Sequence, residues 1–252
     1  MILRSIVTMA ALLLAGSCGG TPEGPTNPDP AVATFTSAHF GFRYPPRDEA
    51  IVPSIAAAVE REYTRILDDL RVAAIPTVTV TLYADHAALE AAVRPIVGGI
   101  PSFASGLVTS STAIHMMSPS AAGWGPLDRM QSNLVHEFAH GVSLQLNPRI
   151  ANNPRWLWES VAIYEARQSV DLRSVSYMAA LDPPSFESMA SVDNTRIYDV
   201  GYSIGEFIVS RWGPLALPQL VAVNGDTASA LGVPLADFQR RWFAFVRERY
   251  GF

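Results

Sequence analysis

His136 and His140 lie four residues apart, and Glu137 follows the first of them directly. On a helix, residues four apart share a face, so both imidazoles can turn a ring nitrogen toward one metal ion. Glu137 lies on the flank of that face, where a carboxylate can take a proton from water that the metal activates. The alternative is a surface helix that happens to carry two histidines.

The residues around this pattern predict a helix. Apolar side chains recur at steps of three and four residues, and Pro126 suits a first helical turn. The recurring residues are Leu127, Met130, Leu134, Phe138, Val142 and Leu146. Residues 147–154 are rich in turn formers and end this helix, after which Asn153 is expected to cap a second helix that begins at Pro154.

Glu159 lies in the second helix, and eighteen residues separate it from His140. The first helix climbs about 9 Å beyond His140, and the second descends about 7.5 Å to Glu159. An antiparallel pair therefore returns Glu159 to the level of the histidines, where its carboxylate can be the third ligand. The fourth tetrahedral position stays open for water, as in a catalytic zinc site.

The two motifs together resemble the gluzincin zinc metallopeptidases. His-Glu-x-x-His is followed by Trp-Leu-Trp-Glu-Ser-Val-Ala at 156–162, whose glutamate comes after a gap of eighteen residues from the second histidine and in which Ser160 replaces the usual glycine. The group includes thermolysin-like proteases, zinc aminopeptidases and small bacterial peptidase MA-like domains. The resemblance implies Zn²⁺ held by His136, His140 and Glu159, and Glu137 as the group that activates water. It also implies a zincin-like α+β fold with a small N-terminal mixed sheet and a mostly helical C-terminal half.

The same resemblance implies a catalytic tyrosine. The Tyr-x-x-Gly at 198–201 matches the family segment whose phenol stabilises the oxyanion, which favours Tyr198. Tyr202 lies one helical turn further on and is the alternative. If neither tyrosine acts, Arg196 or His115 is the remaining candidate donor.

The coarse pattern of the rest predicts strands and helices ahead of the histidines. Alternating residues indicate strands at 40–44, 78–83 and 106–117, the last interrupted by a turn at 109–112. Apolar stripes indicate helices over 48–70 and 86–97, the second capped by Asp85. The resemblance implies an edge strand that pairs with an extended substrate, and Ala113–Met117 is the candidate. Trp156 and Trp158 are expected to pack in the core and beside the site, and Glu165 to face solvent.

The N-terminal residues have the pattern of a bacterial lipoprotein signal. Arg4 precedes an apolar stretch at 6–14, and the segment ends on Cys18, the chain's single cysteine. We expect a signal peptide at 1–18, a flexible linker at 19–34 and a peptidase domain at 35–252. Cys18 would carry the lipid anchor and place the protein in the bacterial cell envelope. Cleavage without lipidation is the alternative.

Composition excludes one class of partner. The net charge is −5, and the eighteen basic residues, all arginine, are dispersed, so no patch indicates nucleic acid. The predicted partner is a peptide or protein substrate, cleaved by metal-activated water. One alternative is a catalytically silent zinc-binding lipoprotein that acts as an interaction or envelope-assembly module, although metal binding alone does not require Glu137. Another is hydrolysis of a cell-wall or other amide.

Overall fold

Five strands in the N-terminal half form one mixed sheet. The computed structural model describes residues 32–122 and 126–252, all within one compact unit, Ala31–Phe252. The strands are β1 (Ala33–Thr36), β2 (Phe40–Tyr44), β3 (Val78–Tyr83), β4 (Gly106–Ser110) and β5 (Ala113–Met117), in the order β1-β2-β3-β5-β4. β3 is parallel to β2 and β5, whereas the outer strands β1 and β4 run antiparallel to their neighbours. The expected α+β class with a mixed sheet is therefore confirmed.

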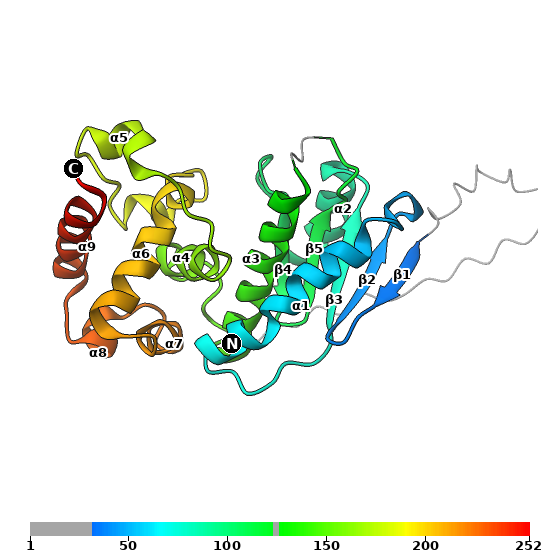
Figure 1. The fold of residues 1–252 in the computed structure, drawn as a ribbon, viewed down its shortest axis with the longest axis horizontal. Helices are drawn as coiled ribbons and strands as arrows, with labels where there is room; N and C mark the ends of the chain where they lie inside the picture. The colour runs from blue at the N-terminus through cyan, green and yellow to red at the C-terminus, as the bar shows by residue number, and fades with distance from the viewer. Residues whose placement is uncertain (1–31, 123–125) are drawn as a thin grey trace, which may run out of the picture. The chain divides into compact units, whose positions relative to one another are not determined.

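Helices make up most of the chain after the sheet (Figure 1). The helices are α1 (Val52–Asp69), α2 (His86–Val97), α3 (Leu127–Leu146), α4 (Arg155–Glu165), α5 (Ser176–Ala179), α6 (Ile197–Trp212), α7 (Ala216–Ala222), α8 (Thr227–Leu231) and α9 (Leu235–Tyr250), with 3-10 turns at Pro46–Asp48, Leu172–Ser174 and Ser188–Ala190. None of the helices within 32–122 and 126–252 has the length and apolar character needed to cross a membrane.

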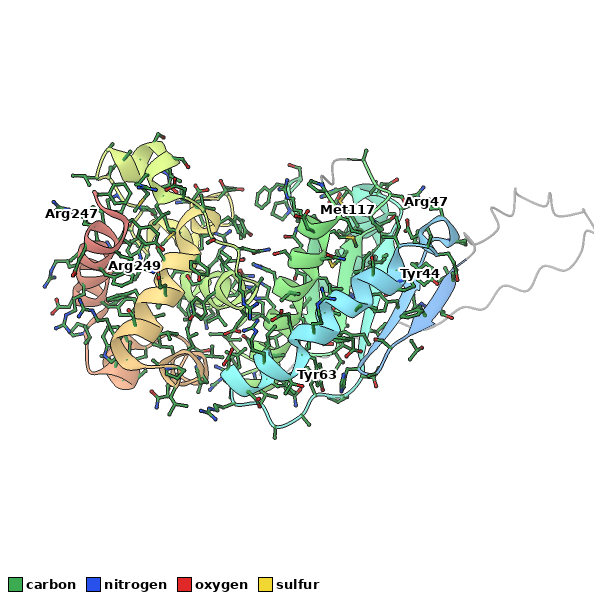
Figure 2. The ribbon with its side chains drawn as sticks, in the orientation of Figure 1. Tyr44, Arg47, Tyr63, Met117, Arg247 and Arg249 are labelled. Atoms are coloured by element: carbon green, nitrogen blue, oxygen red, sulfur yellow. The ribbon has the colours of Figure 1, made fainter. Side chains whose placement is uncertain are left out.

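One face of the sheet packs against α1 and α3. The alternating residues of β2, β3 and β5 are buried there, as period-two strands require. Phe40 of β2 meets Phe138 of α3 edge-on at 5.1 Å between ring centroids. Tyr63 of α1, labelled in Figure 2, stacks on the same Phe138 at 5.5 Å. This packing fixes α3, and with it the two histidines, against the sheet.

Two glycines allow α6 to lie close against α4. A Cβ placed on Gly201 would come within 2.6 Å of Ile163, and one placed on Gly205 within 2.5 Å of Tyr164. Both contacts are far shorter than van der Waals separation, so a side chain at either position would have to displace Ile163 or Tyr164. Tyr198 lies one helical turn before Gly201, which places it over the α4 surface that carries Glu159.

Two predicted helix starts are wrong by one to four residues. The first helix begins at Val52 and not at Asp48, because the Asp48 side chain is buried and accepts hydrogen bonds from Ser118 Oγ at 2.6 Å and Ser120 Oγ at 2.5 Å. That carboxylate ties the 3-10 turn to the segment after β5. Pro154 is the N-cap of α4, with extended backbone, so the helix begins at Arg155.

The predicted edge strand is also wrong. Ala113–Met117 is β5, which lies inside the sheet between β3 and β4. The β4–β5 hairpin folds β4 to the outside, so Gly106–Ser110 is the edge strand. The predicted signal peptide, the linker up to residue 31 and Cys18 lie outside the described residues. The predicted domain boundaries therefore stay predictions.

Candidate metal centre

His136 and His140 face Glu159 across the α3–α4 pair. One side-chain atom from each of the three residues lies within 4.8 Å of the other two, a group that could hold a metal ion. Glu159 Oε2 is 3.4 Å from His136 Nε2 and 3.7 Å from His140 Nε2. Two donors bound to one zinc ion at the tetrahedral angle lie about 3.4 Å apart. The separations therefore fit a small tetrahedral ion. A donor set of two imidazoles and one carboxylate is one that zinc prefers.

The Glu159 oxygen that faces both imidazoles lacks a hydrogen-bond partner among the described residues. Among the described residues, Glu159 Oε2 and His140 Nδ1 are buried without a hydrogen-bond partner. A buried carboxylate oxygen left without a donor costs about 1–3 kcal/mol or more. A cation between the three residues would remove that cost at Oε2, since this is the oxygen that faces both Nε2 atoms.

The charges around the three residues leave a place for one positive ion. Burial lowers the pKa of His140 to about 4, so its ring is neutral at pH 7. Burial also lowers the pKa of His136, but the contact with Glu159, the charges of Glu137 and Glu159 and the bond to Gln168 together raise the pKa overall. Glu159 keeps its charge, because its close contacts with both imidazoles hold its pKa well below the usual value despite burial. Without a metal ion, a protonated His136 would balance the negative charge of Glu159. A bound cation would supply this positive charge instead.

Gln168 orients the first histidine. Its Oε1 lies 2.9 Å from His136 Nδ1, which fixes the proton on Nδ1 and leaves the Nε2 lone pair facing Glu159. Gln168 Nε2 in turn donates to Asn133 Oδ1 at 3.0 Å. Arg167, with φ +53°, turns the chain after α4 so that Gln168 returns to α3. No spacing or periodicity signals this residue, because it lies in the loop beyond the helix end.

Tyr198 and Arg155 approach the other oxygen of Glu159. The Tyr198 hydroxyl lies 3.5 Å from Glu159 Oε1, and Arg155 Nε lies 4.0 Å from the same oxygen. Burial and the charge of Glu159 raise the pKa of Tyr198, so its phenol stays protonated and remains a donor. Arg155 is buried and donates from one nitrogen to the carbonyl oxygens of Met189, Ser191 and Asn194, at 3.1, 3.1 and 2.9 Å.

Arg155 therefore ties the segment that leads into α6 to the helix that carries Glu159. Its Nη2 also donates to the Tyr198 hydroxyl at 3.5 Å. The sequence contains a signal that could have found it: an arginine four residues before Glu159 lies on the same helical face. A buried guanidinium with several carbonyl acceptors holds geometry, because each bond fixes one point of the loop.

Glu137 is buried beside the three ligand side chains. Its carboxylate makes no hydrogen bond or ion pair with any residue that the structure describes. Burial raises its pKa to about 7, with the charge of Glu159 adding to the shift and that of His136 opposing it. Gly106 of β4 lies against this carboxylate, since a Cβ there would come within 3.1 Å of Glu137 Oε1. The edge strand therefore borders Glu137.

The other candidate donors lie elsewhere. Tyr202 packs its ring on Tyr164, at 5.5 Å between centroids. Arg196 is exposed and lies 4.5 Å over the ring of Tyr177. His115 lies on the sheet face opposite to its buried neighbours in β5 and bonds the hydroxyls of Tyr83 and Thr109. Of the four candidates, only Tyr198 reaches the ligand group.

The tryptophans lie as predicted, whereas Glu165 does not. Trp156 stacks on Phe186 in the core at 4.7 Å, and Trp158 stacks on His140 at 3.9 Å. The expectation that Glu165 faces solvent is wrong, because it is 1% exposed and pairs with Arg65 of α1. A cation on the neighbouring helix, which no local pattern reveals, explains its burial.

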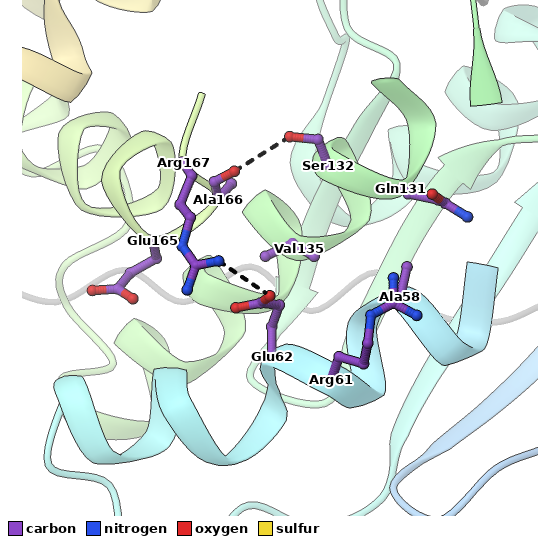
Figure 3. A pocket seen from close by; sticks show the side chains of 9 residues that line it. All are labelled: Ala58, Arg61, Glu62, Gln131, Ser132, Val135, Glu165, Ala166 and Arg167. Atoms are coloured by element: carbon purple, nitrogen blue, oxygen red, sulfur yellow. Dashed lines mark hydrogen bonds and ion pairs between the residues drawn. The ribbon is translucent and has the colours of Figure 1, made fainter. Parts of the chain in front are cut away.

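A cavity of about 180 Å³ lies between α1, α3 and the end of α4 (Figure 3). Its polar groups mostly serve internal contacts: Arg167 pairs with Glu62 at 3.6 Å, and Ser132 donates to the carbonyl of Ala166 at 3.4 Å. The carboxylate of Glu165 turns away from the other side chains drawn. We therefore assign no ligand to this cavity, and the His136–His140–Glu159 group is the candidate functional site.

No protein-family model matches the chain, and no curated protein matches it. The interpretation of the site therefore rests on the motifs and on the geometry given above.

Proposed function

We propose that this chain is a zinc-dependent metallopeptidase of the gluzincin kind, with a zincin-like fold. His136, His140 and Glu159 would hold the ion, and the two-imidazole, one-carboxylate donor set supports zinc with one position left open. Bound zinc would supply a Lewis acid that polarises the scissile carbonyl and lowers the pKa of water. The remaining chemistry falls to side chains of this protein.

The observation that carries the proposal is the state of Glu137. This residue is 8% exposed, its carboxylate has no protein partner among the described residues and lies beside the three candidate ligands, and metal binding alone does not require it. In the proposed reaction Glu137 accepts the proton of the attacking water and returns it to the leaving amine nitrogen as the C–N bond breaks. Tyr198 would donate a hydrogen bond to the oxygen that becomes negative in the tetrahedral intermediate.

The edge strand supports a peptide as substrate. Among the residues that the structure describes, β4 is the outermost strand beyond β5, and it passes Glu137 at Gly106. An extended peptide could add to this edge by backbone hydrogen bonds and bring a peptide bond to the ligand group. We propose β4, in place of the Ala113–Met117 strand expected from the sequence, as the substrate-pairing strand.

A peptide library incubated with the zinc-loaded protein tests the proposal. We expect cleavage that a chelator stops, and a loss of about 10²- to 10⁴-fold in Glu137→Gln at unchanged zinc content, because an amide cannot accept the proton. Glu165→Gln is the matched control, since it makes the same change at a buried carboxylate outside the site and should keep activity. Failure of the zinc-loaded wild type to cleave any peptide would favour the non-catalytic module, and cleavage confined to cell-wall amides would change the substrate class.

The envelope location is a separate proposal that rests on the sequence around Cys18. If acyl chains attached there anchor the protein, Cys18→Ser should move it from the membrane fraction to the soluble envelope fraction. A variant that stays in the membrane fraction with residues 1–18 intact would contradict lipidation.

A further inference from the structure

Two exposed aromatic rings meet beside the metal centre. Phe103 belongs to the segment between α2 and β4, and Tyr198 belongs to α6. Their ring centroids lie 6.4 Å apart in an edge-on arrangement, and the rings are 49% and 38% exposed. The same Tyr198 reaches Glu159 through its hydroxyl. Phe103 precedes Gly106, the residue that borders Glu137, by only three positions.

Phe103 does not owe its place to the hydrophobic core. The core cluster and the partly buried side chains packed against it do not include this residue. Its half-exposed ring makes an aromatic contact with Tyr198, and this contact joins the sheet side of the metal centre to the helical side. Single exposed apolar residues are common, whereas these two rings touch each other beside a buried polar group, where a bound side chain could contact both.

Hydrogen bonds hold the segment around Phe103 on both sides. Before it, the carbonyl of Pro101 lies 3.1 Å from His86 Nε2. After it, Ser105 Oγ accepts from Asn133 Nδ2 at 3.3 Å, and Asn133 is bonded to the Gln168 that orients His136. The ring is therefore carried on a segment whose far end is linked to a metal ligand.

We propose that Phe103 and Tyr198 form an apolar subsite that binds one side chain of the substrate next to the reacting bond. The inference rests on the proposed function and adds a substrate class to it: peptides with a large apolar residue, such as Phe, Leu or Tyr, beside the cleaved bond. Such a side chain removes the exposed faces of both rings from water and gains aromatic contacts. A small or charged side chain at that position gains neither.

Binding of two metal-directed probes tests the subsite without any need for cleavage. Acetohydroxamic acid and 3-phenylpropanohydroxamic acid share the metal-binding head, and only the second has a ring. By calorimetry on the zinc-loaded full chain, we expect wild type to bind the phenyl probe at least tenfold more tightly. Phe103→Ala should reduce that ratio by about five- to thirtyfold, as expected for losing one aromatic contact surface, and Phe103→Leu should retain most of it.

Two comparisons make the result decisive. Leu235→Ala removes a similarly exposed apolar side chain, 44% exposed at the start of α9, and should leave both affinities unchanged. Equal binding of acetohydroxamic acid to wild type and Phe103→Ala would show that the metal centre is intact. A phenyl preference that is absent in wild type, or unchanged in Phe103→Ala, overturns the subsite while the proposed peptidase activity stands. If neither probe binds the zinc-loaded wild type, the open metal position fails, and the subsite fails with it.

Discussion

Helix α4 carries two buried carboxylates whose partners differ, because Glu165 pairs with an arginine and Glu159 faces two histidines. Glu159 is 6% exposed and Glu165 is 1% exposed, and each lies close to side-chain nitrogen atoms of another helix. Glu165 faces the guanidinium of Arg65, at 2.5 Å, a group that is charged at every pH of interest. Glu159 faces two imidazoles, which can be neutral and present lone pairs. The partner, and not burial, therefore separates a structural ion pair from a candidate metal centre.

The unsatisfied oxygen of each carboxylate supports the same distinction. Glu165 Oε1 has no partner among the described residues, and burial raises the pKa of Glu165 to about 7, with Asp69 adding to the shift and Arg65 opposing it. A proton can therefore satisfy that carboxylate. At Glu159 the contacts with the imidazoles hold the pKa low, so a proton is disfavoured and a metal ion is the better occupant.

Among the neighbours of Glu159, Tyr198 is expected to have the largest effect on peptide turnover. Tyr198→Phe keeps the ring and removes only the donor, so we expect peptide turnover to fall by about 10²- to 10³-fold, with zinc content and melting temperature unchanged. Tyr202→Phe is the control, because Tyr202 packs on Tyr164 and should cost little. Steady-state rates and metal analysis on both variants check this. A large loss in Tyr202→Phe with none in Tyr198→Phe would contradict the assignment.

A smaller effect is expected from the residue that orients His136. Gln168→Leu removes the acceptor at Nδ1, and loss of such an outer partner lowers metal affinity by about 10- to 100-fold. Competition with a zinc-binding dye measures the change. Ser132→Ala is the control, since that hydroxyl serves a backbone carbonyl of the α4 end and not a ligand. Unchanged zinc affinity in Gln168→Leu would show that the 2.9 Å contact does not bear on the metal.

At Glu165, the expected effect is a pH dependence of the free energy of unfolding. Because its folded-state pKa of about 7 lies above the unfolded value, the native state binds more protons between pH 4.5 and 7. This contribution therefore lowers the free energy of unfolding as pH rises through that window. Glu165→Gln removes the titration, so relative to wild type it should gain about 2–3 kcal/mol between pH 5 and pH 8.

Urea unfolding at the two pH values, with the metal state held fixed, measures this gain. Arg65 remains paired with Glu62 and Asp69 in the variant, which limits the cost of the lost charge. A difference between Glu165→Gln and wild type that stays constant or falls with pH would contradict the raised pKa.

The residues of one helix pair could be predicted from the sequence because helical geometry fixes them. The four-residue step of His136 and His140, and the lengths of the two helices around the 147–154 turn, determine where Glu159 returns. Those distances need no knowledge of the rest of the fold, and the structure brings the three residues together. The roles of Glu137 and Tyr198 stay predictions, although both lie beside the group.

What could not be predicted depends on contacts between distant segments. The sheet order depends on which strand of the β4–β5 hairpin pairs with β3. The alternation of buried and exposed residues within a strand does not determine which strand that is. Gln168 acts from a loop through its side-chain amide, which has no periodic signature. The four-residue step places Arg155 on the helical face of Glu159, but its loop-carbonyl acceptors have no such signature. The pattern around Asp48 fits a helix start, and only its two serine partners show that this residue lies ahead of the helix.

Zinc titration of the metal-free protein tests the central claim most directly, because it compares the two carboxylates of α4 by the same substitution. Wild type and Glu165→Ala should each bind one zinc ion per chain. Glu159→Ala should lose affinity by more than the 10- to 100-fold expected for an outer partner, since it removes a ligand. Full zinc occupancy in Glu159→Ala at the affinity of wild type would contradict the assignment of Glu159 as the third ligand.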